Sequence, residues 1–238
     1  MAEKLESMPE GWGRALAVVA HPDDMEYGAA SAVARWTAQG KDVRYLLVTR
    51  GEAGFADRPP EEVAPMREVE HRASCDAVGV SELEFLNEPD GLVIADLALR
   101  RRLAYAIRQH RPDVLLSINY RESFGGLRWN HADHRAVGIA LLDAARDAAN
   151  PWIFPELGAA CDPVEFVAFS GSPEPTHAVD VTGHLDAGIR SLQAHASYLA
   201  ALGDLDGEDT VAFLRRGAVA AGRAFGVEHA VSFELRTP

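Results

Sequence analysis

Cysteine is scarce in this chain, which contains only Cys75 and Cys161 among its 238 residues. Neither belongs to a Cys-x-x-Cys pair, so the sequence offers no thiolate metal site and no dithiol redox motif. Two isolated thiols are typical of a reducing compartment. Residues 1–13 are polar and acidic and lack the apolar core of a signal peptide. We therefore expect a cytoplasmic protein.

Long apolar runs and positive charge are also lacking. No apolar run approaches the roughly 20 residues that a membrane-spanning helix needs, so we expect no membrane insertion. The 36 acidic residues outnumber the 23 basic ones, and the net charge is −13. Nucleic acids and anionic membrane surfaces are bound by basic patches, so this balance argues against both as partners. It favours a small-molecule substrate.

A glycine-rich phosphate loop is missing as well. No Gly-x-Gly-x-x-Gly fingerprint follows the first predicted strand, because Gly11 and Gly13 precede it. A non-catalytic nucleotide-binding module is therefore disfavoured.

The sequence does contain a regular alternation of short apolar runs and helical patterns. Residues 15–20 form a continuous apolar run, which is typical of a strand buried on both faces of a parallel sheet. Further strands are predicted at residues 43–49, 83–86, 114–118, 164–169, 177–181 and 230–235. Helices are predicted at residues 27–39, 61–78, 95–110, 134–149, 183–202 and 209–224.

This order predicts an α/β fold with a Rossmann-like, doubly wound and mostly parallel sheet that has helices on both faces. The length fits one domain over residues 1–238, with residues from about 181 onward as a C-terminal extension of that domain. Ligands of such folds bind beyond the carboxyl ends of the strands. Two loops rich in polar side chains leave such ends, so we expect them to meet in one crevice.

The first of these loops is His21-Pro22-Asp23-Asp24, directly after the first strand. His21 and Asp24 are three residues apart, so one tight turn can direct both side chains inward. The following helix begins here, where its dipole favours carboxylates. Alternatively, the two aspartates only cap that helix.

The second loop ends in His131-Ala132-Asp133-His134 at the start of a helix. The two histidines are again three apart, and Asp133 can accept a hydrogen bond from an imidazole and so fix its tautomer. A polar loop followed by a capped helix is the alternative reading.

Taken together, the two loops supply the residue types of a catalytic zinc site. Two histidines and one carboxylate hold zinc in many hydrolases and leave one position for water. A spare carboxylate and a spare histidine then remain for proton transfer. Fe(II) oxygenases use the same ligand types, although their usual β-only folds do not match the strand–helix alternation.

The motif of residues 21–24, with Glu26 beyond it, and His131-x-Asp-His134 resemble the LmbE-like, or PIG-L-type, de-N-acetylases. This family includes deacetylases of mycothiol and bacillithiol synthesis and of N-acetylglucosaminyl-phosphatidylinositol. The resemblance covers most of the chain, with further similar stretches at residues 49–54, 67–70, 89–91 and 130–135. Met25 and Ala132 depart from the common pattern, and neither position carries a ligand.

The resemblance implies that His21, Asp24 and His134 hold Zn²⁺ or another divalent metal. It implies that Asp23 is the general base. It also implies that His131 polarises the carbonyl, with Asp133 orienting it.

Arg67 and Asp90 are expected to bind sugar hydroxyls of the substrate. The expected activity is removal of an acetyl or other acyl group from an N-acetylated amino sugar or glycoconjugate. An amidase for a thiol conjugate of the mycothiol type, or for an antibiotic intermediate, is the alternative. The resemblance also implies a homo-oligomer. The sequence does not decide the role of His195 or of the C-terminal segment.

Overall fold

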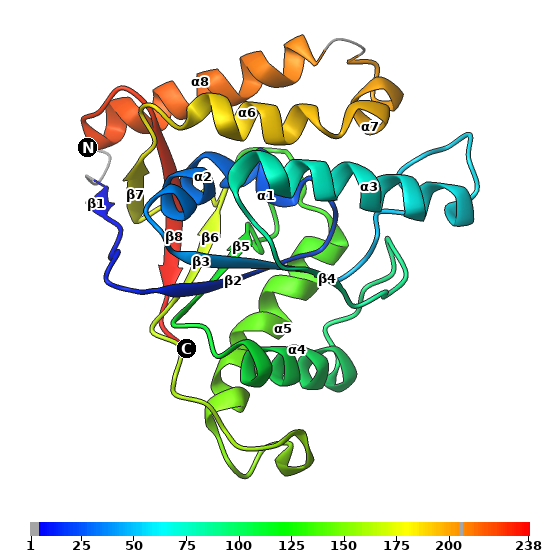
Figure 1. The fold of residues 1–238 in the computed structure, drawn as a ribbon, viewed down its shortest axis with the longest axis vertical. Helices are drawn as coiled ribbons and strands as arrows, with labels where there is room; N and C mark the ends of the chain where they lie inside the picture. Colours follow the sequence, from blue (N-terminus) through cyan, green and yellow to red (C-terminus); the bar gives the residue numbers. More distant parts are fainter. Residues whose placement is uncertain (1–4, 205–206) are drawn as a thin grey trace.

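A computed structural model describes residues 5–204 and 207–238 (Figure 1). Its centre is an eight-stranded sheet with the order β1-β7-β8-β6-β5-β2-β3-β4. Strand β8 is antiparallel to both of its neighbours, and the other adjacent pairs are parallel. The strands are β1 (Glu6–Ser7), β2 (Arg14–Val19), β3 (Asp42–Leu47), β4 (Leu83–Phe85), β5 (Val114–Ile118), β6 (Val167–Ser170), β7 (His177–Asp180) and β8 (Ala230–Arg236). The predicted α/β class with a mostly parallel sheet is confirmed.

Helices cover both faces of this sheet. In Figure 1, α1, α2, α3 and α6 lie on one side and α4 and α5 on the other, with α8 outside α6. The helices are α1 (Asp24–Gly28), α2 (Ala30–Ala38), α3 (Pro60–Val78), α4 (Leu97–His110), α5 (Ala132–Ala149), α6 (Leu185–Gln193), α7 (Ala196–Ala201) and α8 (Glu208–Phe225), with a 3₁₀ turn at Pro155–Leu157.

The alternation of side chains along β2 explains the two layers. Val19 and the other odd-numbered residues of the strand pack into the cluster formed with α2 and α3. Val18 and the other even-numbered residues after Arg14 pack into the cluster formed with α4 and α5. A fully buried valine or leucine contributes about 1.5–3 kcal/mol relative to an exposed one. A strand that is apolar on both faces is thus stable only in the middle of such a sandwich.

Two predicted helices are interrupted in the structure. The helix expected at residues 27–39 is divided at Ala29, beside Gly28, where a Cβ atom would lie 2.3 Å from the Ser170 hydroxyl. The helix expected at residues 183–202 is divided at His195, whose side chain is fully buried. The periodicity of the sequence alone gives no sign of either break.

The carboxyl ends of β2, β3, β4, β5 and β6 meet at one edge of the sheet, and the two predicted loops lie there. The C-terminal segment contributes β8 to the sheet and brings α7 and α8 to the same edge. Within the described ranges, no helix combines the length and the apolarity that crossing a bilayer requires.

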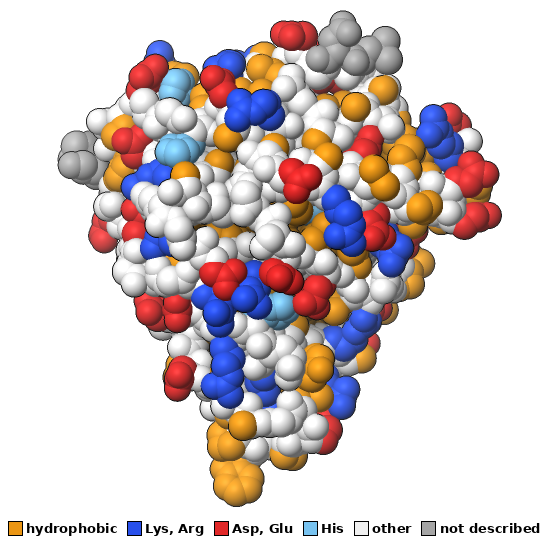
Figure 2. All heavy atoms as spheres, viewed as in Figure 1, with side chains coloured by type: hydrophobic (Ala, Val, Ile, Leu, Met, Phe, Trp, Pro, Cys, Tyr) orange, Lys and Arg blue, Asp and Glu red, His pale blue; other side chains and the backbone are white. Residues whose placement is uncertain are grey.

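Acidic and basic side chains are interspersed on the face shown in Figure 2.

Candidate metal centre

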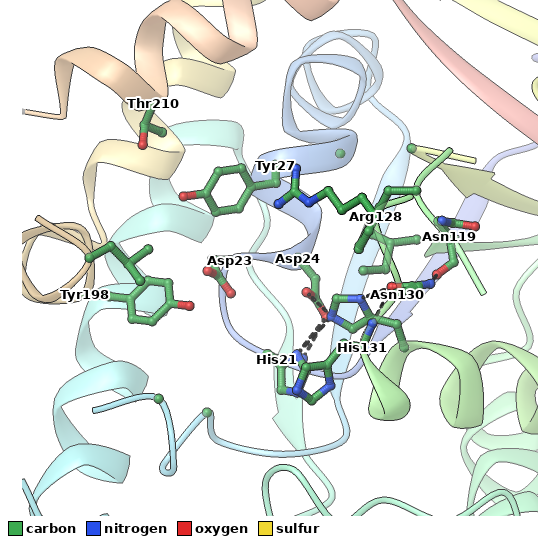
Figure 3. A pocket seen from close by; sticks show the side chains of 18 of the residues that line it. His21, Asp23, Asp24, Tyr27, Asn119, Arg128, Asn130, His131, Tyr198 and Thr210 are labelled. Carbon is green, nitrogen blue, oxygen red and sulfur yellow. Dashed lines mark hydrogen bonds and ion pairs between the residues drawn. The ribbon is translucent and has the colours of Figure 1, made fainter. Parts of the chain in front are cut away.

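A cavity of 1410 Å³ lies at the carboxyl edge of the sheet. Its floor is formed by the loops after β2 and β5, and its walls by the loops after β3, β4 and β6 and by α7 and α8. Polar side chains from four of these segments face the cavity in Figure 3: His21, Asp23, Asp24, Tyr27, Asn119, Arg128, Asn130, His131, Tyr198 and Thr210. The two motifs that are more than 100 residues apart in sequence therefore meet in one place.

Three donor atoms converge at the floor. The Nδ1 atom of His21 lies 3.1 Å from Nε2 of His134, and the latter lies 3.1 Å from Oδ1 of Asp24. The other carboxylate oxygen of Asp24 lies 3.6 Å from His21 Nδ1. Ligand atoms around a tetrahedral zinc, at about 2.1 Å from the metal, are separated by about 3.4 Å. The spacing of the three groups fits a divalent cation.

The outer nitrogens of the two rings support the same conclusion. Nδ1 of His134 lies 2.9 Å from Oδ1 of Asn130, and Nε2 of His21 lies 3.1 and 3.2 Å from Asp90 and Asp133. A carboxylate can only accept, and the amide oxygen also accepts, so these outer nitrogens carry the protons. With the outer nitrogens protonated, the facing nitrogens of the two neutral rings can both offer lone pairs to a cation placed between them.

The ionisable side chains at the cavity floor shift one another's pKa values. Burial alone would lower the pKa of His21, but Asp24 and the carboxylates of Asp133 and Asp90 raise it well above its usual value. Burial would raise the pKa of Asp24, and the two histidines outweigh this and hold it well below its usual range. Asp24 is therefore ionised and ready to bind a cation.

Asp23 stands beside the donor group with a strained backbone. Its φ of 102° is unusual for a residue with a side chain, and such strain is found at functional sites. The side chain is buried. This burial raises its pKa to about 7, although the Arg67 guanidinium counteracts part of the increase. A carboxyl group with such a pKa can take up and release a proton near neutral pH.

Arg67 is fully buried at the edge of the cavity. Its Nη2 donates to the carbonyl oxygen of Pro22 and lies 3.2 Å from Oδ1 of Asp23, and its guanidinium lies 3.8 Å above the ring of Tyr198. Its expected role in binding sugar hydroxyls stays a prediction. In the structure its charge lies beside Asp23, and the residue also lines the cavity.

Asp133 was expected to orient His131, but in the structure its carboxylate contacts other groups. Its carboxylate contacts Nε2 of His21 and accepts the backbone N–H groups of Gly91 and Val93. The expected partner, His131, instead accepts the backbone N–H of Asp133 at its Nδ1 and caps α5. The first turn of α5 therefore directs Asp133 towards the strand loops and His131 into the cavity.

Asp90 was expected to bind substrate, and it lines the cavity. Its two oxygens already contact His21 and the backbone N–H of Ala53, with Thr49 Oγ1 3.4 Å away. It therefore acts as a partner of His21 in this structure.

Sequence reasoning missed several residues that shape the site. Asn130 is buried and fixes His134, and its amide group also donates to the backbone of Asn119 and Arg121. Its position four residues before His134 was the available signal. Tyr198 lies on α7, and nothing in its sequence neighbourhood connects it with the floor of the cavity.

Residues 16–145 match the sequence profile of PIG-L, the GlcNAc-PI de-N-acetylase family. A diacetylchitobiose deacetylase of Thermococcus kodakarensis is 28% identical, covering 77% of this chain and 69% of the relative. A 1D-myo-inositol 2-acetamido-2-deoxy-alpha-D-glucopyranoside deacetylase of Acidothermus cellulolyticus is 31% identical, covering 90% and 86%.

Solved structures show the same fold. The N,N'-diacetylchitobiose deacetylase of Pyrococcus horikoshii superimposes with a TM-score of 0.87 at 23% identity, covering 95% of this chain and 85% of the other. A conserved protein of Thermus thermophilus gives a TM-score of 0.77 at 25% identity, covering 94% of each chain. The match extends over the C-terminal segment, beyond the residues that the family profile covers.

Proposed function

The chain belongs to the PIG-L family of de-N-acetylases and is a hydrolase of linear amides, and from this premise we propose that it removes an acetyl group from an N-acetylated amino sugar that carries a second group. One observation carries the proposal. Two imidazole nitrogens and a carboxylate face one another at 3.1–3.6 Å beside a buried carboxyl group of raised pKa. Binding modules have no need for such a proton-accepting group next to a metal site.

His21, Asp24 and His134 are the proposed ligands of zinc or another divalent cation. His131 offers a further nitrogen within 4.8 Å of the two other rings. Asp24 is the better third ligand, because it is buried and directs one oxygen to each histidine, whereas His131 is exposed. A cation held there supplies Lewis-acid chemistry, lowering the pKa of water and polarising an amide carbonyl.

Asp23 is the proposed general base. Arg67 and the strained backbone hold its carboxylate beside the donor group, and its pKa of about 7 suits a group that must accept a proton at neutral pH. Asp23 takes a proton from the attacking water. It then returns this proton to the nitrogen of the leaving amine, which completes the hydrolysis.

His131 is the proposed hydrogen-bond donor to the carbonyl oxygen. Its Nδ1 accepts a backbone N–H, so the neutral ring carries its proton on Nε2. Burial and the neighbouring histidines lower the pKa of His131, which favours this neutral form. A neutral N–H donor is sufficient to stabilise the negative charge that develops on the oxygen.

The size of the cavity supports a substrate larger than a single sugar. Ligand sites are commonly about 300–1,000 Å³, and this one is 1410 Å³. Tyr27 and Phe213 form an edge-to-face pair in the wall, and Phe124 and Trp129 line another part. Aromatic rings of this kind pack against the apolar faces of sugars. The relatives named above act on a disaccharide and on a sugar linked to inositol, which agrees with this size.

The experiment is a measurement of primary-amine release from a panel of N-acetylated amino sugars, with acetamides of thiol conjugates and antibiotic precursors included. The zinc-loaded wild type is compared with Asp23→Asn and with Asp57→Asn, which alters an exposed aspartate in the loop after β3. We expect kcat to fall about 10²- to 10⁴-fold in Asp23→Asn alone, with zinc still bound.

Turnover of the sugars by the wild type and near-normal turnover in Asp23→Asn would refute the assigned role of Asp23. Turnover confined to the thiol conjugates or antibiotic precursors would replace the proposed substrate class. No release from any acetamide by protein that holds zinc at residues 21, 24 and 134 would refute the activity.

A further inference from the structure

A second group of metal-binding side chains lies in the core, apart from the centre described above. Glu26 comes from α1, His71 from α3, and His195 from the junction of α6 and α7. Both histidine side chains and that of Glu26 are completely buried. Figure 1 shows these helices together on one side of the sheet. The group therefore joins three helices in the interior.

The potential ligand atoms are close together. Nδ1 of His71 lies 3.9 Å from one oxygen of Glu26, and Nε2 of His195 lies 4.0 Å from the other. One ligand atom of each residue lies within 4.8 Å of the other two. A zinc ion with ligands at about 2.1 Å needs separations of about 3.4 Å, so side-chain shifts of about an ångström or less would complete the geometry.

These polar atoms have no partners in the described part of the chain. Neither ring nitrogen of His71 or His195 forms a hydrogen bond there, and Oε2 of Glu26 forms none. Buried polar atoms without partners destabilise a folded protein, so most are satisfied by protein groups, water or a metal. Five such atoms on three adjacent residues are hard to explain as chance defects.

The surroundings hold the group in place without satisfying it. The hydroxyl of Ser74 donates to Oε1 of Glu26 at 2.6 Å and lies 2.7 Å from that of Ser191. The nearby guanidinium of Arg67 is directed towards Pro22 and Asp23. The carboxylate of Glu26 is therefore fixed in orientation, but no lysine or arginine among the described residues lies within salt-bridge distance of it.

We propose that Glu26, His71 and His195 bind a second divalent cation, which fastens α1 to α3 and to the α6–α7 junction. Two imidazoles and a carboxylate are the donor types that zinc favours, and a trapped water can serve as the remaining ligand. The ion neutralises the buried carboxylate and satisfies one nitrogen of each ring. Since α1 also carries Asp24, this ion stabilises the floor of the cavity, where the proposed catalytic centre lies.

The burial of the three ligands predicts slow exchange. His21 and His134 border an open cavity and have side chains 13% and 12% exposed, whereas His71 and His195 are at 0%. A chelator reaches the catalytic ion directly, but it reaches the second ion only when the helices separate. The second ion is thus bound during folding and retained afterwards.

The test refolds the full chain with zinc, dialyses it against EDTA, and measures zinc per chain by mass spectrometry. We expect about two zinc ions before chelation and about one after it. The His134→Ala variant should hold about one ion that resists EDTA, because it lacks only the exposed centre. His195→Gln should retain none after EDTA, whereas His229→Gln, which belongs to neither group, should behave as wild type.

If His195→Gln does not fold, the proposal can be tested on crystals of the wild type instead. Anomalous scattering measured at the zinc edge then locates any bound zinc. A peak between Glu26, His71 and His195 would support the proposal. Zinc confined to the cavity floor, with only water between these three residues, would overturn it. Complete loss of zinc from the folded wild type in EDTA would also overturn it.

Discussion

The chemistry of the cavity floor depends on which ring nitrogen of each histidine carries a proton. Asn130 occupies the outer nitrogen of His134, and Asp133 and Asp90 occupy that of His21. When a ring is neutral, its proton is thereby held on the outer nitrogen, which leaves the facing nitrogen free for a cation. Groups that hold a ligand in this way contribute to metal affinity almost as directly as the ligand itself.

Replacing Asp133 with asparagine should therefore weaken metal binding at the proposed site of His21, Asp24 and His134. Asparagine keeps the shape of the side chain but loses the charge that favours a proton on His21 Nε2. We expect the affinity for zinc at the EDTA-accessible site to fall about 10- to 100-fold. Competition with a chromophoric chelator measures this affinity. Asp143→Asn, on the same helix and half exposed, is the control, and equal affinities in the two variants would contradict the assignment.

The sequence predicted which residues gather at the site better than it predicted their pairings. The motifs at residues 21–24 and 131–134 each follow a strand or loop that the alternating pattern identified. The partner of Asp133 could not be predicted, since it depends on the direction of the first turn of α5. Arg67 is a similar case: its contact with Asp23 depends on how α3 lies across the first loop.

At the level of elements, α5 brings His134 to the floor of the cavity by packing closely against the sheet. Gly138 on this helix permits that approach, because a Cβ atom there would lie 2.2 Å from Cβ of Tyr120 and 3.3 Å from the ring of Phe169. Both atoms of the closest contact would be Cβ atoms, which are bonded directly to the backbone. Rotation of a side chain therefore cannot separate them. Helix α5 must therefore shift if the residue is enlarged.

We predict that Gly138→Ala lowers the free energy of unfolding by about 1–3 kcal/mol, the usual effect of overpacking. It should also reduce kcat, because His134 moves with the helix. Urea unfolding and amine release measure the two effects. Gly217→Ala on α8 is a matched control, since it is exposed within a helix and, apart from the backbone of its own helix, no atom of the described residues lies within 4 Å of its Cβ position. It should stabilise the protein by about 0.5–1 kcal/mol, and equal losses in both variants would contradict the packing argument.

The regular elements were predicted well where local pattern determines them. The strand expected at residues 114–118 is β5 with the same bounds, and the helix expected at 61–78 differs from α3 by one residue. The two-residue strand β1 was missed, because it exists only through its pairing with β7. The breaks at Ala29 and His195 were missed because both residues lie within continuous helical patterns of the sequence.

Across the whole molecule, the C-terminal segment is an integral part of the sheet and of the site. Strand β8 lies between β7 and β6 and is antiparallel to both, which the strand–helix alternation did not indicate. Tyr198 and Thr210 from this segment line the cavity, which answers the question that the sequence left open. The expected homo-oligomer stays a prediction.

Glu234 on β8 links this segment to the loop that follows β5. Its buried carboxylate accepts two hydrogen bonds from Arg121, each of 2.8 Å, and one from Ser172. Burial alone would raise the pKa of Glu234, but these hydrogen bonds outweigh it and hold the pKa below its usual range. The ionised group therefore connects residues more than 100 positions apart and supports the loop that leads to His131.

Replacing Glu234 with glutamine should lower the free energy of unfolding by about 2 kcal/mol at neutral pH, since the hydrogen bonds to a charged group are weakened. Because the folded-state pKa is below the unfolded value of about 4.3, the ionised carboxylate stabilises the fold above that pH. This contribution is lost as the pH falls through the folded-state pKa. The difference between wild type and variant should therefore shrink when urea unfolding is repeated from about pH 7 down to about pH 3.5.

Glu228→Gln, with its side chain 72% exposed, should differ little from wild type throughout. A deficit in Glu234→Gln that stays constant over this range would show that packing, and not the charge of Glu234, fastens the C-terminal strand to the catalytic loop.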